Sequence, residues 1–213
     1  MTADITPAHI HTTAFHEAAH AVMAMMKRCW VSELVVYDEP REGVLGCCWR
    51  TPASHWMDDV WVHLAGPVAD TINCNIEIRE AFFKGGQSDF EKARARFGKL
   101  LYPRIPDELR DHIGEDVGTF LTLVCDGWVP EGLRGQCKRR FTLFANKCLE
   151  VDHHICSWIY DEAKRVREFM IDTPWFLEGV RHLADHLAEA RHVTGEVMKD
   201  LLIKHYDESR VAA

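Results

Sequence analysis

Two histidines four residues apart lie in a segment whose apolar residues recur at the spacing of an α-helix. The apolar positions of the segment 12–30 are Ala14, Ala18, Ala21, Val22, Met25 and Met26. Thr12 or Thr13 is the predicted N-cap of this helix. Residues at positions i and i+4 lie one above the other on a helix, so His16 and His20 can present their imidazole nitrogens to one cation. The segment therefore predicts an early helix that can hold a metal ion.

The residue after His16 is a glutamate, which completes the pattern H-E-x-x-H. At this position the Glu17 carboxylate lies beside the metal, where it can take a proton from a water instead of coordinating. Zinc lowers the pKa of a bound water to about 7, which makes hydroxide available for attack on a carbonyl. In a chain with 13 histidines, chance supplies only about 0.06 matches to this pattern. The pattern thus predicts a zinc site for amide hydrolysis, with Glu17 as the general base.

A catalytic zinc ion usually has three protein ligands, so a third ligand must come from elsewhere in the chain. In the metzincin arrangement a glycine and a third histidine follow the motif, but Met23 and Met26 occupy those two positions. In a thermolysin-like arrangement the third ligand is a glutamate on a later helix, for which Glu77 and Glu80 are the candidates. The residues by themselves therefore exclude the first arrangement and leave the second one open.

The remaining sequence predicts a mainly α fold with a small β-hairpin or sheet after the first helix. Strand-like residues at 31–36 and 44–49 flank turn-forming residues at 38–43. Later helical patterns cover 55–75, 75–83, a segment from Ser88 that ends before Pro103, 107–125, 135–167 with a possible break, 175–189 and 197–205.

Two local features refine these helices. Gly66-Pro67 predicts a kink or a new start within the helix 55–75. Ser88 and Glu91 have the spacing of a capping box, which predicts a helix start at Ser88.

Length and composition favour one domain. With 213 residues, of which 47% are hydrophobic, the chain can bury a sizeable core, whereas two independent domains would be cramped. No internal repeat, low-complexity tract or flexible linker interrupts it. We expect a single domain over 1–213, with a zinc-binding catalytic part over 1–102 and a helical part over 103–213.

The charge and the apolar runs exclude several classes of partner. A net charge of -8 repels nucleic acid and anionic membranes, so no nucleic-acid partner is expected. Residues 1–10 lack the basic and apolar parts of a signal peptide, and no apolar run approaches the roughly 20 residues that cross a bilayer. We expect no membrane span and a cytoplasmic protein. In that compartment the eight cysteines, which include no C-x-x-C pair, remain thiols.

The histidine segment resembles the peptidase domain of FtsH-type, membrane-tethered AAA proteases. Residues 13–21, T-A-F-H-E-A-A-H-A, are similar to the T-A-Y-H-E-A-G-H-A of that family. Further similar segments, in chain order, are 43–46 to its A-L-G edge strand, 64–70 to its L-G-G-R-A-A-E helix, 85–93 to its G-A-S-N-D-L-E-Q-A, 160–163 to its A-Y-E-R-A and 194–197 to its L-D-G-E-E. The ordered similarity covers most of the chain except about 103–151.

The resemblance implies roles for further residues. It implies that Asp89 is the third zinc ligand, although by its position alone Asp89 is equally a first-turn carboxylate that stabilises the helix dipole. It implies that Asp70 accepts a hydrogen bond from a ligand imidazole. Finally, it implies that the backbone of a polypeptide substrate adds to the edge strand. The residues of this expected substrate-binding strand are Val44, Leu45, Gly46 and Cys47.

The chain differs from that family in one respect that bears on function. It contains no G-x-x-x-x-G-K-[ST] phosphate loop and is too short to hold an ATPase module beside the peptidase. We therefore expect an ATP-independent zinc metalloendopeptidase that cleaves unfolded or flexible polypeptides with Zn²⁺ as its cofactor. A homo-oligomer and a separate ATPase partner stay open. The alternatives are a zinc-containing peptide-binding or regulatory module without proteolysis, which the retained Glu17 disfavours, and a helical scaffold with an accidental motif.

Overall fold

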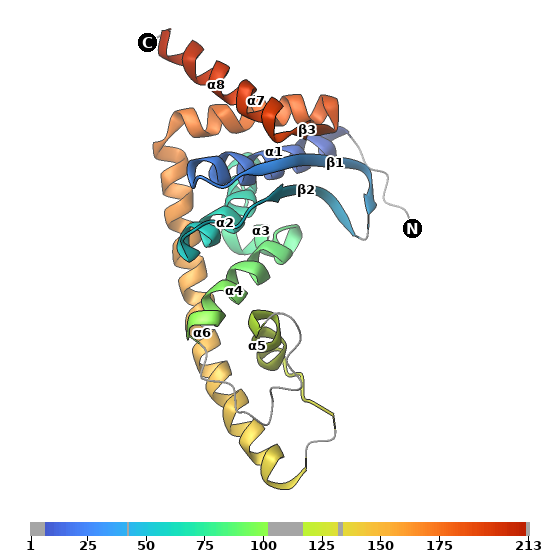
Figure 1. Cartoon of the computed structure of the whole chain (residues 1–213), viewed down its shortest axis with the longest axis vertical. Coiled ribbons are helices and arrows are strands. Elements are labelled where there is room, and N and C mark those ends of the chain that lie inside the picture. Colours follow the sequence, from blue (N-terminus) through green and yellow to red (C-terminus); the bar gives the residue numbers. More distant parts are fainter. Residues whose placement is uncertain (1–6, 42, 102–116, 132–133, 212–213) are drawn as a thin grey trace. The chain divides into compact units, whose positions relative to one another are not determined.

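The computed structural model describes residues 7–41, 43–101, 117–131 and 134–211, and in these residues the mainly α prediction is confirmed (Figure 1). The elements in chain order are α1 (Pro7–Met26), β1 (Val31–Arg41), β2 (Val44–Arg50), α2 (Trp56–Asn73), α3 (Ile78–Lys84), α4 (Gln87–Leu101), α5 (Val117–Cys125), α6 (Gly135–Asp172), α7 (Pro174–Ala190), β3 (His192–Thr194) and α8 (Gly195–Val211). None of the helices in the described ranges is both long and apolar enough to cross a membrane.

The contacts divide the chain into two compact units. The first unit comprises Met1–Asp89 and Glu162–Ala213, and the second comprises Phe90–Asp161. In the first unit α1 packs against α2, α7 and the strands β1 and β2. Figure 1 shows α1 running beside β1, between α7 and α2. The expected single domain over 1–213, with parts 1–102 and 103–213, stays a prediction.

Helix α1 begins at Pro7, so the predicted N-cap at Thr12 or Thr13 is wrong. Proline favours the first turn of a helix because its missing N–H has no partner there. The Thr13 hydroxyl donates instead to the carbonyl of His9, one turn earlier in the same helix (2.9 Å). The buried face of α1 is built mostly of small residues, which lets the neighbouring elements approach closely. Its fully buried members are Ala14, Ala18, Ala19, Ala21, Met23 and Ala24.

The sheet has the strand order β2-β1-β3, and both pairs are antiparallel. Strand β1 continues to Arg41, so the predicted turn at 38–43 is too long, and Gly43 occupies a left-handed position with φ +82°. The pattern of the sequence missed β3, because three residues are too few for a periodicity. Strand β1 is paired with β2 on one side and with β3 on the other. In the described part of the sheet, β2 is therefore the edge strand that lies next to α1.

The register places two residues of β2 on the side that faces α1. Gly46 pairs with Val36 and Cys48 pairs with Leu34, and both of these β1 residues are buried. Residues that pair across an antiparallel ladder point to the same face. Gly46 and Cys48 therefore face α1, whereas Cys47 points to the opposite side.

Helix α2 runs without interruption through Pro67, so the new start predicted at Gly66-Pro67 is wrong. The proline removes one backbone hydrogen bond, and the buried residues on both sides of it hold the helix together. Helix α4 begins at Gln87, which puts Ser88 inside the first turn instead of at the predicted capping-box position. Gly86 lies against the Pro67 ring, since a Cβ added there would be 2.5 Å from Pro67 Cγ.

The second unit has its own core and its own ion pairs around the buried Arg94. Arg94 donates to both carboxylate oxygens of Asp152 (2.7 and 2.8 Å) and to Asp126 (3.0 Å). Of the helix predicted at 107–125, Val117–Cys125 is helical and the earlier residues lie outside the described ranges. Helix α6 is unbroken. The core residues are Phe120, Leu121, Val124, Cys125, Phe141, Phe144 and Cys148.

Candidate metal centre

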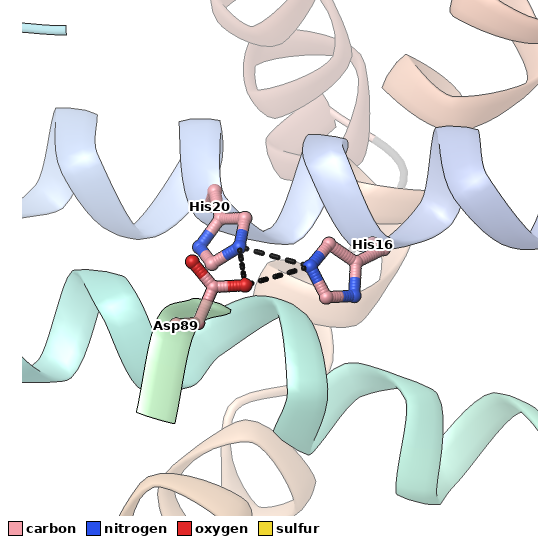
Figure 2. Close-up of side chains that lie close together, drawn as sticks. All are labelled: His16, His20 and Asp89. Atoms are coloured by element: carbon pink, nitrogen blue, oxygen red, sulfur yellow. Dashed lines mark hydrogen bonds and ion pairs between the residues drawn. The ribbon is translucent and has the colours of Figure 1, made fainter. Parts of the chain in front are cut away.

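Three side chains of the first unit point toward one another: His16 and His20 from α1, and Asp89 from the first turn of α4 (Figure 2). The two Nε2 atoms are 3.1 Å apart, and Asp89 Oδ2 lies 3.2 Å from His16 Nε2 and 3.3 Å from His20 Nε2. The three ligand atoms, one from each residue, all lie within 4.8 Å of one another. Imidazole nitrogens and a carboxylate oxygen are the donor types found at catalytic zinc sites. The three residues could therefore hold a divalent metal ion.

Hydrogen bonds from α2 orient both imidazole rings. His20 Nδ1 donates to the carbonyl oxygen of Val62 (2.6 Å), and His16 Nδ1 lies 2.7 Å from Asp70 Oδ2. Because the carbonyl can only accept, His20 carries its proton on Nδ1 and turns the lone pair of Nε2 toward the centre. The Asp70 carboxylate favours the same tautomer at His16. Asp70 thus contacts one of the two imidazoles, which is the partner that the resemblance implies for it, while the contact of the Val62 carbonyl has no signal in the sequence.

Gly66 of α2 provides the space in which the two rings meet. A Cβ added to this residue would lie 2.4 Å from His20 Nε2 and 2.5 Å from His16 Nε2. Ordinary contacts between non-bonded heavy atoms are about 3.5 Å or longer. Any side chain at position 66 would therefore collide with the two donor atoms. The absence of a Cβ beneath converging donor atoms fits a site that must leave room for an ion.

The charges around the centre favour a cation. Burial alone lowers the pKa of His16, but the carboxylates of Asp70 and Asp89 outweigh it and raise this pKa well above its usual value. Burial alone raises the pKa of Asp89, but the neighbouring His20 and His16 rings hold this pKa well below its usual value. Two largely buried carboxylates beside two imidazoles thus prefer added positive charge, which a proton or a metal ion can supply.

Glu17 follows His16 on α1 and lies against the edge strand β2. A Cβ added to Gly46 would be 2.8 Å from Glu17 Cγ and 3.0 Å from Glu17 Oε1, so the strand backbone passes directly over this carboxylate. Cys48 lies on the same face, and burial raises the pKa of its thiol, with the Glu17 and Asp89 carboxylates adding to this effect. The buried Glu17 side chain is therefore positioned between the histidines and a strand edge.

The other residues of the expected substrate-binding strand also lie in β2. Val44 is exposed at the start of the strand, and Leu45 and Cys47 are half-buried on the side away from α1. The structure thus places one of the four side-chain positions, Gly46, directly at the candidate centre. The remaining three contribute backbone to the same edge.

The two glutamates that the sequence left open as third ligands lie elsewhere. Glu77 is the exposed N-cap residue of α3, and Glu80 forms an ion pair with Lys84 on the same helix. Neither belongs to the cluster of His16, His20 and Asp89, and among the described residues no second cluster of three potential ligands is found. Geometry thus favours Asp89 over both glutamates.

Comparisons with known proteins add no family. No protein-family model matches the chain, and a search of the curated proteins finds no relative. The resemblance to FtsH-type peptidase domains therefore rests on the motif residues given above, and membership of that family stays a prediction.

Proposed function

We propose that this chain is an ATP-independent zinc metallopeptidase, similar to the FtsH-type peptidase domains, that hydrolyses peptide bonds in unfolded or flexible polypeptides. One observation carries the proposal: the donor atoms of His16, His20 and Asp89 converge beside a buried Glu17, under a strand edge. A helical scaffold with an accidental motif gives no reason for an aspartate from a distant segment to meet both histidines. It also gives no reason for a glycine to leave space beneath them.

Each residue of the centre has a distinct task in this reaction. His16, His20 and Asp89 would hold the zinc ion, and Asp70 and the Val62 carbonyl fix the ring orientations. Zinc, when bound, lowers the pKa of a water and polarises the scissile carbonyl. Glu17 takes the proton of the attacking water and returns it to the leaving amine, which is general base and then general acid catalysis.

The edge strand supports unfolded or flexible polypeptides as the proposed substrate. An extended polypeptide can add to β2 through main-chain hydrogen bonds, and its scissile bond then passes over Glu17. A folded protein has its backbone groups already paired, so only unfolded or flexible segments can bind in this way. Action without ATP is part of the proposal. Cytoplasmic location is part of the proposal, as is the absence of a nucleic-acid partner.

The proposal is tested by zinc analysis and proteolysis with the native chain and Glu17→Gln. Glutamine keeps the size of the side chain but cannot take the proton, so cleavage of a reduced, carboxymethylated protein should fall by about 100-fold or more with zinc content unchanged. Glu80→Gln is the matched control, because the same change is made at a half-buried helix position that is not part of the candidate centre. We expect it to leave both zinc content and cleavage at native levels.

The outcomes separate the three hypotheses. Stoichiometric zinc with cleavage that depends on Glu17 supports the peptidase. Zinc without cleavage by the native chain supports the peptide-binding or regulatory module instead. A native chain that takes up no zinc overturns both metal proposals and leaves the helical scaffold.

A further inference from the structure

A largely buried cluster of Arg50, Asp59 and His63 connects the end of β2 to the N-terminal half of α2. Arg50 Nη1 donates to Asp59 Oδ1 (2.6 Å), and Arg50 Nη2 lies 3.3 Å from His63 Nε2. Asp59 is only 2% exposed and also accepts the backbone N–H of Ala53 (3.2 Å). The His63 side chain is 15% exposed, so its ring is held in place at a largely buried position.

The partners of His63 fix its tautomer. A guanidinium group has only N–H donors, so Arg50 donates and His63 Nε2 accepts. Burial and the neighbouring Arg50 charge lower the pKa of His63 to about 3, which keeps the ring neutral at neutral pH. A neutral imidazole that accepts at Nε2 carries its hydrogen on Nδ1. Within the described ranges this Nδ1–H has no hydrogen-bond partner in the protein.

The position of His63 in α2 places the residue on the helix face that lies under the candidate metal centre. His63, Gly66 and Asp70 are spaced i, i+3 and i+7, so they share one face of the helix. Gly66 lies under the Nε2 atoms of both ligand histidines, and His63 is one turn away, about 4.5 Å along the helix axis. The preceding residue, Val62, accepts the hydrogen bond of His20.

The edge strand approaches His63 from the other side. Gly46, Cys48 and Arg50 alternate along β2, and Gly46 and Cys48 face α1. Arg50 continues this face and reaches His63. The ring of His63 therefore lies between the helix face beneath the candidate centre and the strand to which a substrate backbone would add.

We propose that His63 contacts the substrate: its Nδ1–H donates a hydrogen bond to the oxygen of the scissile carbonyl as that oxygen becomes negatively charged. This inference rests on the proposed function. Attack on a carbonyl develops negative charge on its oxygen, and one oriented donor aimed at such an oxygen is worth a factor of about 100 to 1,000 in kcat. A neutral ring can donate this bond without placing a second full positive charge next to the metal ion, and Arg50 fixes its direction.

Three variants of His63 distinguish a direct contact with the substrate from an indirect role in which His63 only holds Arg50 in place. The amide of asparagine reaches the position of Nδ1, whereas the longer glutamine reaches the position of Nε2. We therefore expect His63→Ala and His63→Gln to lose about 100-fold in kcat at nearly native KM. His63→Asn should keep kcat within about 10-fold of the native value, because an N–H donor remains where Nδ1 was.

A role confined to holding Arg50 makes the opposite prediction, because only glutamine can replace the Nε2 acceptor. Glutamine more active than asparagine would overturn the inference, as would native kinetics in all three variants. We expect each variant to keep about one zinc ion per chain. Loss of zinc from all three would show that His63 supports the structure of the metal site, and it would overturn the proposal too.

A second measurement does not depend on turnover. A phosphinic peptide carries a tetrahedral, negatively charged group that resembles the state to which His63 would donate. Its affinity for zinc-loaded protein, measured by calorimetry, should fall in alanine and glutamine variants and be largely retained in His63→Asn. If the native chain cleaves its substrate and binds the phosphinic peptide, and all variants bind this peptide with equal affinity, the inference about His63 alone is overturned. A native chain that neither cleaves nor binds overturns the proposed function and the inference with it.

Discussion

Replacement of Gly66 by alanine tests the candidate metal centre with a single methyl group. The new Cβ would lie 2.4 Å from His20 Nε2 and 2.5 Å from His16 Nε2, about 1 Å inside the normal contact distance. Both rings must therefore move by about 1 Å, whereas zinc ligands keep their distances to within about 0.2 Å. Such a shift also disturbs the hydrogen bonds of the rings to Val62 and Asp70.

These displacements give the expected magnitude. Loss of one orienting partner costs a metal site about 10- to 100-fold in affinity, so disturbance of two predicts a zinc affinity lower by about 100- to 10,000-fold. The helix itself gains from the change, since alanine is about 1 kcal/mol more favourable than glycine within a helix. We thus expect Gly66→Ala to be a folded protein that has lost tight zinc binding.

Zinc affinity is measured by competition with a chromogenic chelator, and folding by circular dichroism of the metal-free protein. Gly179→Ala in α7 is the matched control, because the added Cβ would meet only Leu202 Cδ2 at 3.4 Å. This control should bind zinc as the native chain does and melt about 2–4 °C higher. A folded Gly66→Ala variant with native zinc affinity would refute the geometry of the site and the reasoning built on it.

Three further changes test neighbouring features. Asp70→Asn weakens the orientation of the imidazole bound to it, so zinc affinity should fall by about 10- to 100-fold in the same chelator assay. Gly46→Val, which inserts a side chain 2.8 Å from Glu17 Cγ, should reduce cleavage at least about 10-fold at unchanged zinc content. Asp59→Asn should lower the free energy of unfolding at pH 7 by about 3 kcal/mol in urea titrations, because it leaves Arg50 without its buried partner. Burial by itself raises the pKa of Asp59, but Arg50 brings it below its usual value, so the carboxylate stabilises the folded state above about pH 4. The difference between native and variant should therefore be constant near neutral pH and shrink as the pH falls below about 4; a difference that persists at pH 2 would count against the pairing.

Local spacing in the sequence was enough to predict part of the candidate site. The interval of four residues between His16 and His20 determines that both rings leave the same side of a helix, whatever the rest of the fold does. The hairpin after this helix was likewise predictable from β-branched residues on either side of a turn. Asp89 required the resemblance of a longer segment, because a carboxylate in the first turn of a helix is common for electrostatic reasons alone.

The contacts that complete the site depend on the approach of distant segments, which no local pattern reports. The Val62 carbonyl is a backbone group, so its bond to His20 has no counterpart in the choice of side chain. Gly66 was visible only as a helix breaker beside Pro67, while in the fold its lack of a Cβ makes room for two imidazoles. His63 lies 13 residues after Arg50, and their pairing emerges only when the strand end reaches α2.

The contact of α1 with α7, and of β1 with β3, has a consequence for the order of events during synthesis. The helix that carries both histidines and the strand β1 leave the ribosome well before their partners, which are α7 (Pro174–Ala190) for α1 and β3 (His192–Thr194) for β1. Until they emerge, one apolar side of α1 and one edge of β1 stay uncovered. The unit that holds the histidines can therefore complete its core only after β3 has been translated, long after α1 itself.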